Sequence, residues 1–420
     1  MFKLESFRKF ILALALSGLP FIGSGNPVTT PNKRDAAPPS TENVVELQRL
    51  AVKRSLIPRQ TATLWENKWQ TAYLGNITID QTIFQLMVDT GSSHTWVTVS
   101  NLTCTHTDNC ITKHLPLATN EKWRYPMDSR YNKGRVVGGL VQRSVSVAGI
   151  TIPSQLVGVA WNITNMPLDG SVQGLLGLGL KAGTWYPDGM PKEYEYDPVF
   201  QNILDKGYKS FSIALRGVEN PSGSVDPGIL AFGGVPKSIV ANSPWARAYL
   251  STSDPHYLIS IDSYVLVGGP SIQLTPAERT AVIDSGTTIS FLPDKVAVAF
   301  FNSIPGTGKV TDICQKNADG TLNTGPNEKC IDKDSDLWKI PCSARAQAPP
   351  FSVVINGVEF KLRADTLIVQ VGTNYCASGI QSSTGDFILG ENFMKNVVVY
   401  HDYSNQQAPI MDIATYDYKP

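Results

Sequence analysis

A short phrase ending an apolar run occurs twice in the chain. Residues 88–93 read VDTGSS and residues 282–288 read VIDSGTT, so each run ends in an aspartate, a hydroxyl residue, a glycine and further hydroxyl residues. Asp89 and Asp284 hold the equivalent places, 195 positions apart (284 − 89). A single Asp-Thr-Gly is an ordinary turn sequence, but its repetition in the same context indicates a duplicated structural unit.

A second signal follows each phrase and extends the repeat. Residues 175–177 read LLG and residues 388–390 read ILG. Two halves with the same order of signals predict two similar lobes related by an approximate two-fold axis. Because such an axis brings equivalent residues together, we expect Asp89 and Asp284 to meet where the lobes join.

Length and patterning favour an all-β protein with two lobes. The chain has 420 residues, of which 42% are hydrophobic, enough for a large core. Short alternating or apolar runs dominate from about residue 72 onward, and helical periodicity is clear only in residues 197–207 and 294–304. Lys plus Arg equals Asp plus Glu, 36 against 36, so no overall positive field favours nucleic acid as a partner.

The N-terminal region is typical of a secreted precursor. A basic start followed by an apolar run and small residues predicts a signal peptide over residues 1–25. Residues 26–54, rich in Pro and Ser and ending in a dibasic pair, predict a pro-segment. We expect an N-terminal lobe over 55–235 and a C-terminal lobe over 236–420. No second apolar run has spanning length, so we predict an extracellular protein without a membrane anchor.

Two further features agree with secretion. Asn76, Asn101 and Asn162 each begin an Asn-x-Thr glycosylation signal. Six cysteines favour three disulfides in an oxidising compartment, although sequence alone allows 15 pairings. Pairing nearest neighbours joins Cys104 to Cys110, Cys314 to Cys330 and Cys342 to Cys376.

One alternative for the first cysteine pair is a metal site. Cys104, His106, Cys110 and His114 could supply four zinc ligands. Their spacing is not a common zinc pattern, and an oxidising compartment favours the disulfide, so we predict no metal.

Two carboxylates in contact have a specific chemical use. Held about 3 Å apart they cannot both ionise easily, so they share a proton and supply one acid and one base; the aspartic-protease pair is the standard case of this rule. One can deprotonate a water while the other protonates a carbonyl oxygen, which hydrolyses an amide without a cofactor.

The neighbouring residues suit that role. Gly91 and Gly286 allow close backbone approach to the carboxylates. Ser92 and Thr287 can donate hydrogen bonds to the outer carboxylate oxygens. The hydroxyls of Thr90 and Ser285 can hydrogen-bond across the junction and hold the two loops together.

On these residues, the chain resembles the pepsin-like aspartic proteases, most of all the secreted fungal members, from about Tyr73 to the C-terminus. The two Asp phrases, the two glycine segments and Trp96 carry the resemblance. It implies a bilobal fold of two similar β-barrel lobes with pseudo-two-fold symmetry and an active-site cleft between them. It also implies a monomer that binds extended polypeptides and pepstatin-like inhibitors, and family positions for the disulfides Cys104–Cys110 and Cys342–Cys376.

The family also has a hairpin, the flap, that closes over substrate with a tyrosine at its tip. Counting back from residues 144–150 places that tyrosine at Tyr131, followed by Asn132, Lys133 and Gly134. Family flaps usually carry glycine and a small hydroxyl residue where Asn132 and Lys133 stand, so substrate preference and efficiency are in question. We expect Trp96 and Tyr257 to be packing residues at the cleft wall.

Two other readings compete with an acid endopeptidase. The same fold could serve as a non-catalytic binding protein or inhibitor, which the altered flap favours and the intact aspartates oppose. A polysaccharide-active enzyme would need carboxylates several ångströms apart, whereas the two-fold repeat predicts direct contact.

Overall fold

The structure is a computed structural model that describes the greater part of the chain beyond the N-terminal region. The predicted signal peptide and pro-segment, residues 1–54, lie outside the described residues, as do Asn132 and Lys133. Within the described ranges, no helix is long and apolar enough to cross a membrane. The described residues are 60–66, 72–105, 111–131, 134–166, 171–184, 194–215, 228–236, 239–251, 254–269, 272–318, 322–333, 337–370 and 376–416.

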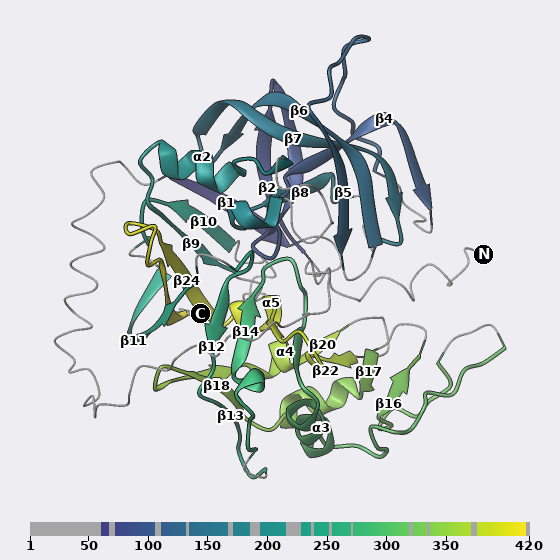
Figure 1. The fold of residues 1–420 in the computed structure, drawn as a ribbon. Helices are drawn as coiled ribbons and strands as arrows, with labels where there is room; N and C mark the ends of the chain where they lie inside the picture. The colour runs from purple at the N-terminus through teal and green to yellow at the C-terminus, as the bar shows by residue number, and fades with distance from the viewer. Residues whose placement is uncertain are drawn as a thin grey trace, which may run out of the picture.

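A 13-stranded sheet forms most of the N-terminal lobe and continues toward the other one (Figure 1). Its spatial order is β11-β25-β24-β9-β10-β1-β2-β3-β8-β4-β7-β6-β5. The strands are β1 Gln60–Glu66, β2 Tyr73–Ile79, β3 Thr82–Asp89, β4 Trp96–Thr105, β5 Tyr125–Tyr131, β6 Gly134–Val147, β7 Ile150–Thr164, β8 Gly174–Gly177, β9 Ser210–Ala214, β10 Gly228–Phe232, β11 Val240–Tyr249, β24 Val397–Asp402 and β25 Ile410–Tyr416.

Three of these strands come from beyond residue 236, so the two halves of the chain share one sheet. β24 pairs antiparallel with β9, from Val398 opposite Ala214 to Asp402 opposite Ser210, and β25 joins β24 to β11. Figure 1 shows β24 and β11 beside β9 and β10, between the lobes. This shared sheet ties the lobes together through backbone hydrogen bonds.

The C-terminal lobe contains three smaller sheets, with orders β12-β14-β23-β15-β22, β13-β18-β19 and β16-β17-β21-β20. Their strands are β12 Leu258–Ser260, β13 Ser263–Leu266, β14 Thr280–Ile283, β15 Ser290–Pro293, β16 Cys330–Asp332, β17 Leu337–Ile340, β18 Phe351–Ile355, β19 Val358–Leu362, β20 Ile368–Gln370, β21 Cys376–Ser378, β22 Ile380–Ser383 and β23 Ile388–Leu389.

Helices are few and short, as predicted. The expected helical stretches 197–207 and 294–304 contain α2 Val199–Asp205 and α3 Asp294–Ser303, which bury the apolar faces that the periodicity marked. The other helices in the described part of the chain are α4 Ala364–Leu367 and α5 Glu391–Met394, with 3-10 turns η2 Lys181–Thr184, η5 Ala277–Arg279 and η6 Cys342–Gln347.

The predicted duplication is visible in the pairing around each Asp phrase. β3 runs parallel to β8, with Asp89 opposite Gly177, and β8 pairs antiparallel with β4. In the other lobe β14 runs parallel to β23, with Ile283 opposite Leu389, and β23 pairs antiparallel with β15. The prediction of an all-β, bilobal fold is therefore confirmed.

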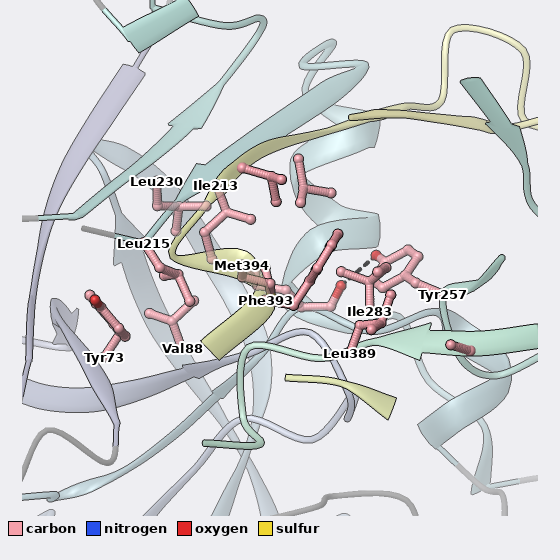
Figure 2. Close-up of a cluster of buried hydrophobic side chains, with 14 of the residues drawn as sticks. Tyr73, Val88, Ile213, Leu215, Leu230, Tyr257, Ile283, Leu389, Phe393 and Met394 are labelled. Atoms are coloured by element: carbon pink, nitrogen blue, oxygen red, sulfur yellow. Dashed lines mark hydrogen bonds between the residues drawn. The ribbon is translucent and has the colours of Figure 1, made fainter. Parts of the chain in front are cut away.

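One hydrophobic core lies beneath both Asp phrases (Figure 2). Val88 precedes Asp89 and Ile283 precedes Asp284, and both side chains are fully buried in the same cluster. Phe393 and Leu389, also in the cluster, bring the second glycine segment into it. Burial at about 25 cal/mol per Å² of apolar surface makes such a core the main support of the two loops above it.

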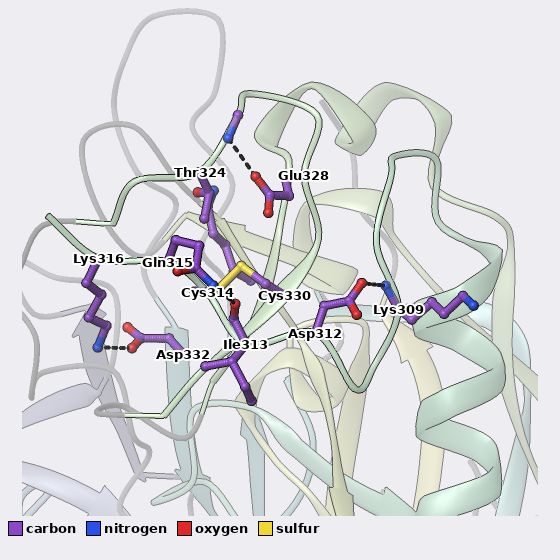
Figure 3. Close-up of a disulfide and its surroundings, with 12 residues drawn as sticks. Lys309, Asp312, Ile313, Cys314, Gln315, Lys316, Thr324, Glu328, Cys330 and Asp332 are labelled. Carbon is purple, nitrogen blue, oxygen red and sulfur yellow. Dashed lines mark hydrogen bonds and ion pairs between the residues drawn. A yellow bond between two sulfur atoms is a disulfide. The ribbon is translucent and has the colours of Figure 1, made fainter.

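Two of the three predicted disulfides are present. Cys314 bonds to Cys330, as Figure 3 shows, and Cys342 bonds to Cys376. The first closes a polar loop of the C-terminal lobe, and the second links η6 to β21. The side chain of Cys104 and the whole of Cys110 lie outside the described residues, so their pairing stays a prediction.

Candidate active site

The two aspartates lie at equivalent ends of equivalent strands. Asp89 is the last residue of β3, and Asp284 follows directly after β14. Their exposed fractions are 0% and 1%. A carboxyl group this deeply buried needs hydrogen-bond partners, and the two loops supply them.

Each carboxyl receives the same two hydrogen bonds from its own loop. The backbone N–H of Gly91 donates to Asp89 Oδ1 at 2.8 Å, and Ser92 Oγ donates to Asp89 Oδ2. The backbone N–H of Gly286 donates to Asp284 Oδ1 at 2.8 Å, and Thr287 Oγ1 donates to Asp284 Oδ2. The expected partners of the outer oxygens are thus the observed ones.

Four hydrogen bonds cross the junction between the loops. Thr90 N donates to Ser285 Oγ at 3.1 Å, and Ser285 N donates to Thr90 Oγ1 at 3.0 Å. The same hydroxyls donate onward, Thr90 Oγ1 to Ile283 O at 3.0 Å and Ser285 Oγ to Val88 O at 2.8 Å. Each hydroxyl therefore satisfies backbone groups of the opposite lobe, and the pattern obeys the two-fold axis.

The loops approach so closely that one glycine is required. A Cβ built on Gly91 would lie 2.5 Å from both Cγ and Oδ1 of Asp284. Real Cβ atoms do not approach other atoms this closely, so any larger residue would separate the loops. The glycine of the first Asp phrase, Gly91, thus permits the contact between the lobes.

The pKa values of both aspartates are raised above the ordinary value. Burial, followed by repulsion from Asp284, raises the pKa of Asp89 well above its ordinary value. Burial also raises the pKa of Asp284, which hydrogen bonds from Thr287 and Gly286 hold down. Two carboxyls that interact this strongly titrate as a unit, so the pair keeps a proton to higher pH than an isolated aspartate would.

The predicted flap tyrosine is in contact with the predicted wall tryptophan. β5 and β6 form a hairpin whose last pair is Tyr131 opposite Gly134. Trp96 Nε1 donates a hydrogen bond to Tyr131 Oη at 2.9 Å, and both side chains are buried. The tip residues Asn132 and Lys133 lie outside the described residues.

Tyr257 has a larger part in the site than sequence reasoning assigned to it. It is fully buried, and its hydroxyl donates to Leu178 O at 2.6 Å. Leu178 N donates in turn to Asp89 O at 2.8 Å, while Ile283 N donates to Tyr257 O at 3.1 Å. Tyr257 therefore connects the segments under both aspartates. In the sequence, the signal for Tyr257 was its place at the start of the strand-like run 257–269, part of which pairs antiparallel with the strand before Asp284.

The three glycosylation asparagines are all described, whereas His114 is the one residue of the alternative zinc set whose side chain is described. Asn76 and Asn101 are exposed and Asn162 is partly buried. His114 Nδ1 is 2.9 Å from Thr98 Oγ1, and His106 and Cys110 lie outside the described residues. Among the described residues, no group of three or more His, Cys, Asp and Glu side chains could hold a metal ion.

A bilobal β fold in which each lobe supplies one aspartate to a proton-sharing pair defines the class of two-aspartate hydrolases. The profile of the family described as eukaryotic aspartyl protease matches residues 72–412. The chain therefore belongs to the eukaryotic aspartyl protease family.

Known relatives agree with that assignment. Rhizopuspepsin-4 of Rhizopus niveus is 27% identical over 354 residues, covering 81% of this chain and 77% of the relative. A probable aspartic-type endopeptidase of Aspergillus fumigatus is 25% identical, covering 78% of this chain and 75% of the relative. The crystal structure of an aspartic proteinase from Irpex lacteus has the same fold, with a TM-score of 0.63 and 18% identity over 86% of this chain and 98% of that one.

Proposed function

We propose that this chain is the precursor of a secreted aspartic endopeptidase that hydrolyses peptide bonds at acidic pH. The observation that carries the proposal is the buried pair, in which Asp89 and Asp284 hold the same hydrogen bonds on either side of a two-fold axis. A protein with the same fold but no catalytic role would not need both carboxyls, because burying each of them costs free energy.

The proposed mechanism uses water as the nucleophile. The ionised member of the pair takes a proton from a water bound between the carboxyls, while the protonated member donates to the carbonyl oxygen of the peptide. Burial raises the pKa of both Asp89 and Asp284, which supports a pair that keeps one proton in acid, so that one carboxyl donates a proton while the other acts as the base. The cross-lobe bonds of Thr90 and Ser285 hold the two groups in place, which supports direct attack without a covalent intermediate.

The proposed substrate is an extended polypeptide bound between the lobes. We infer a preference for apolar or aromatic residues at the cut bond from the family resemblance. Trp96 and Tyr131 are both buried and joined by a hydrogen bond, so the hairpin that carries Tyr131 has a fixed base in the N-terminal lobe. The same geometry suits pepstatin-like inhibitors. We further propose secretion, removal of residues 1–54 and function as a monomer.

Cleavage of a denatured protein substrate between about pH 2 and 8 tests this proposal. We expect cleavage at acidic pH that a statine-type inhibitor blocks and that Asp89→Asn and Asp284→Asn abolish. Asp205→Asn, an exposed aspartate on α2, is the matched control. A folded, processed protein that cleaves nothing would contradict the proposal and favour a binding protein with altered flap residues Asn132 and Lys133.

A further inference from the structure

The two Asp loops keep matching hydrogen bonds at both of their ends. Besides the bonds to the aspartates, a hydroxyl at the far end of each loop accepts from the glycine segment of the same lobe. Gly177 N donates to Thr95 Oγ1 at 3.2 Å, and Gly390 N donates to Ser290 Oγ at 3.2 Å. The two-fold repeat therefore extends through the whole of each loop.

Between those ends, the loops differ in kind at one buried position. The phrases DTGSSHT and DSGTTIS place His94 where the second loop has Ile289, and both side chains are buried. A buried polar ring needs a hydrogen-bond partner. His94 Nδ1 lies 2.8 Å from the hydroxyl oxygen of Tyr196, which belongs to neither loop.

The backbone around Tyr196 is fixed by contacts with three other elements. Thr184 Oγ1, in η2, donates to Tyr196 O at 3.2 Å and accepts from Tyr196 N at 3.2 Å. The next carbonyl, Asp197 O, accepts hydrogen bonds from Gln155 Nε2 of β7 at 3.0 Å and from Asn202 Nδ2 of α2 at 3.1 Å. Tyr196 is therefore a fixed point against which a neighbouring loop can be held.

The ring of Tyr196 has packing contacts that do not depend on its hydroxyl. It is buried in the same hydrophobic cluster as Trp96 and Tyr131, the pair at the base of the flap hairpin. A phenylalanine at this position would keep that packing and lose only the polar contact. Because a tyrosine hydroxyl can donate or accept, the bond to His94 can form with the imidazole neutral or protonated.

We propose that Tyr196 is a positioning residue for the first Asp loop: its hydroxyl holds His94, and through it Ser92 and Asp89, in the geometry needed for catalysis. His94 lies two residues after Ser92, whose hydroxyl donates to Asp89 Oδ2. Small displacements of a catalytic group cost much of its rate enhancement. The second loop has the buried apolar side chain of Ile289 at this position instead. This inference rests on the proposed function.

The test is kcat and KM on one peptide substrate for Tyr196→Phe, His94→Ile and the double variant. Loss of one buried hydrogen bond that aligns the loop should lower kcat of Tyr196→Phe by about 3–10-fold and change KM by less than about 2-fold. His94→Ile gives the first loop the residue of the second. Since both changes remove the same bond, the double variant should lose no more than either single one.

Two more variants separate positioning from packing. His94→Asn keeps a polar atom near the place of Nδ1 and should retain most of the wild-type kcat. Tyr194→Phe, which removes the hydroxyl of a partly exposed tyrosine two residues before Tyr196, is the matched control and should leave kcat unchanged. Urea titration shows that each variant is folded under the assay conditions.

Binding of a statine-type inhibitor gives a readout that needs no turnover, and Tyr196→Phe should weaken it by a similar factor. Wild-type kcat in folded Tyr196→Phe, or losses that multiply in the double variant, would overturn the inference. A wild type that binds the inhibitor but cleaves nothing would refute the proposed function, and inhibitor binding by the variants would still decide the role of Tyr196. A wild type that does neither would refute both.

Discussion

Replacing Ser285 with alanine removes two of the four hydrogen bonds that join the active-site loops. Ser285 Oγ accepts from Thr90 N at 3.1 Å and donates to Val88 O at 2.8 Å. The side chain is fully buried, with an exposed fraction of 0%. Water therefore cannot easily replace the lost hydroxyl, and one N–H group and one carbonyl group lose their partner.

The expected cost follows from those two groups. A buried polar group left without a partner costs about 1–3 kcal/mol, so two of them lower the free energy of unfolding by about 2–6 kcal/mol. The loops also lose alignment, because each lobe holds the other through these bonds. We therefore expect kcat/KM to fall along with stability. Thr90→Ser keeps the hydroxyl and should cost much less.

Urea titration followed by tryptophan fluorescence measures the change in the free energy of unfolding. Ser404→Ala, an exposed serine in the turn between β24 and β25, is the matched control and should change it by less than about 0.5 kcal/mol. Equal stabilities of wild type and Ser285→Ala, within that margin, would refute the argument that the cross-lobe bonds hold the junction together.

Three further predictions concern buried polar groups. Burial and Asp284 raise the folded-state pKa of Asp89 above its unfolded value. The protonated carboxyl therefore stabilises the folded state in acid, and this stabilisation is lost as pH rises through the folded pKa. Asp89→Asn should reduce the fall in Tm between about pH 4 and 7, and an unchanged fall would contradict this prediction. Burial lowers the pKa of His401 from 6.5 to about 3, so stability is lost as pH drops from 6.5 toward 3, by on the order of 4 kcal/mol. His401→Phe should flatten that loss in urea titrations at both ends of this range, and the idea fails if wild type and variant lose stability in parallel. Tyr257→Phe leaves Leu178 O without its hydroxyl partner and should lower the free energy of unfolding by about 1–3 kcal/mol, measured by the same titration; no change would show that this bond is not needed.

Much of the site could be predicted because its signals are local and repeated. The Asp phrases and glycine segments indicated which strands end in carboxylates and that the two lobes are alike. The same phrases predict the hydrogen bonds of four hydroxyl residues, because each hydroxyl bonds to a group in its own loop or in the equivalent loop of the other lobe. These residues are Thr90, Ser92, Ser285 and Thr287. The helical periodicity of residues 197–207 and 294–304 likewise needs no information from distant residues.

Other features depend on pairing between distant segments. The return of β24 and β25 to the sheet of the N-terminal lobe joins residues nearly two hundred positions apart, and no periodicity states which strand will accept another. For the same reason, sequence reasoning treated Tyr257 as a wall residue, whereas its hydroxyl reaches a carbonyl of the other lobe.

The sequence by itself determined that two equivalent aspartates end two equivalent strands, because a repeated phrase imposes the same local backbone and the same hydrogen-bond donors on each. Only the tertiary structure decided how the two lobes are joined. β24 pairs with β9, and β25 joins β24 to β11, in one sheet, because backbone hydrogen bonds between strands depend on which segments meet in space and not on their distance along the chain. The likeness of the two lobes is therefore a property of the sequence, and the sheet that joins them is a property of the fold.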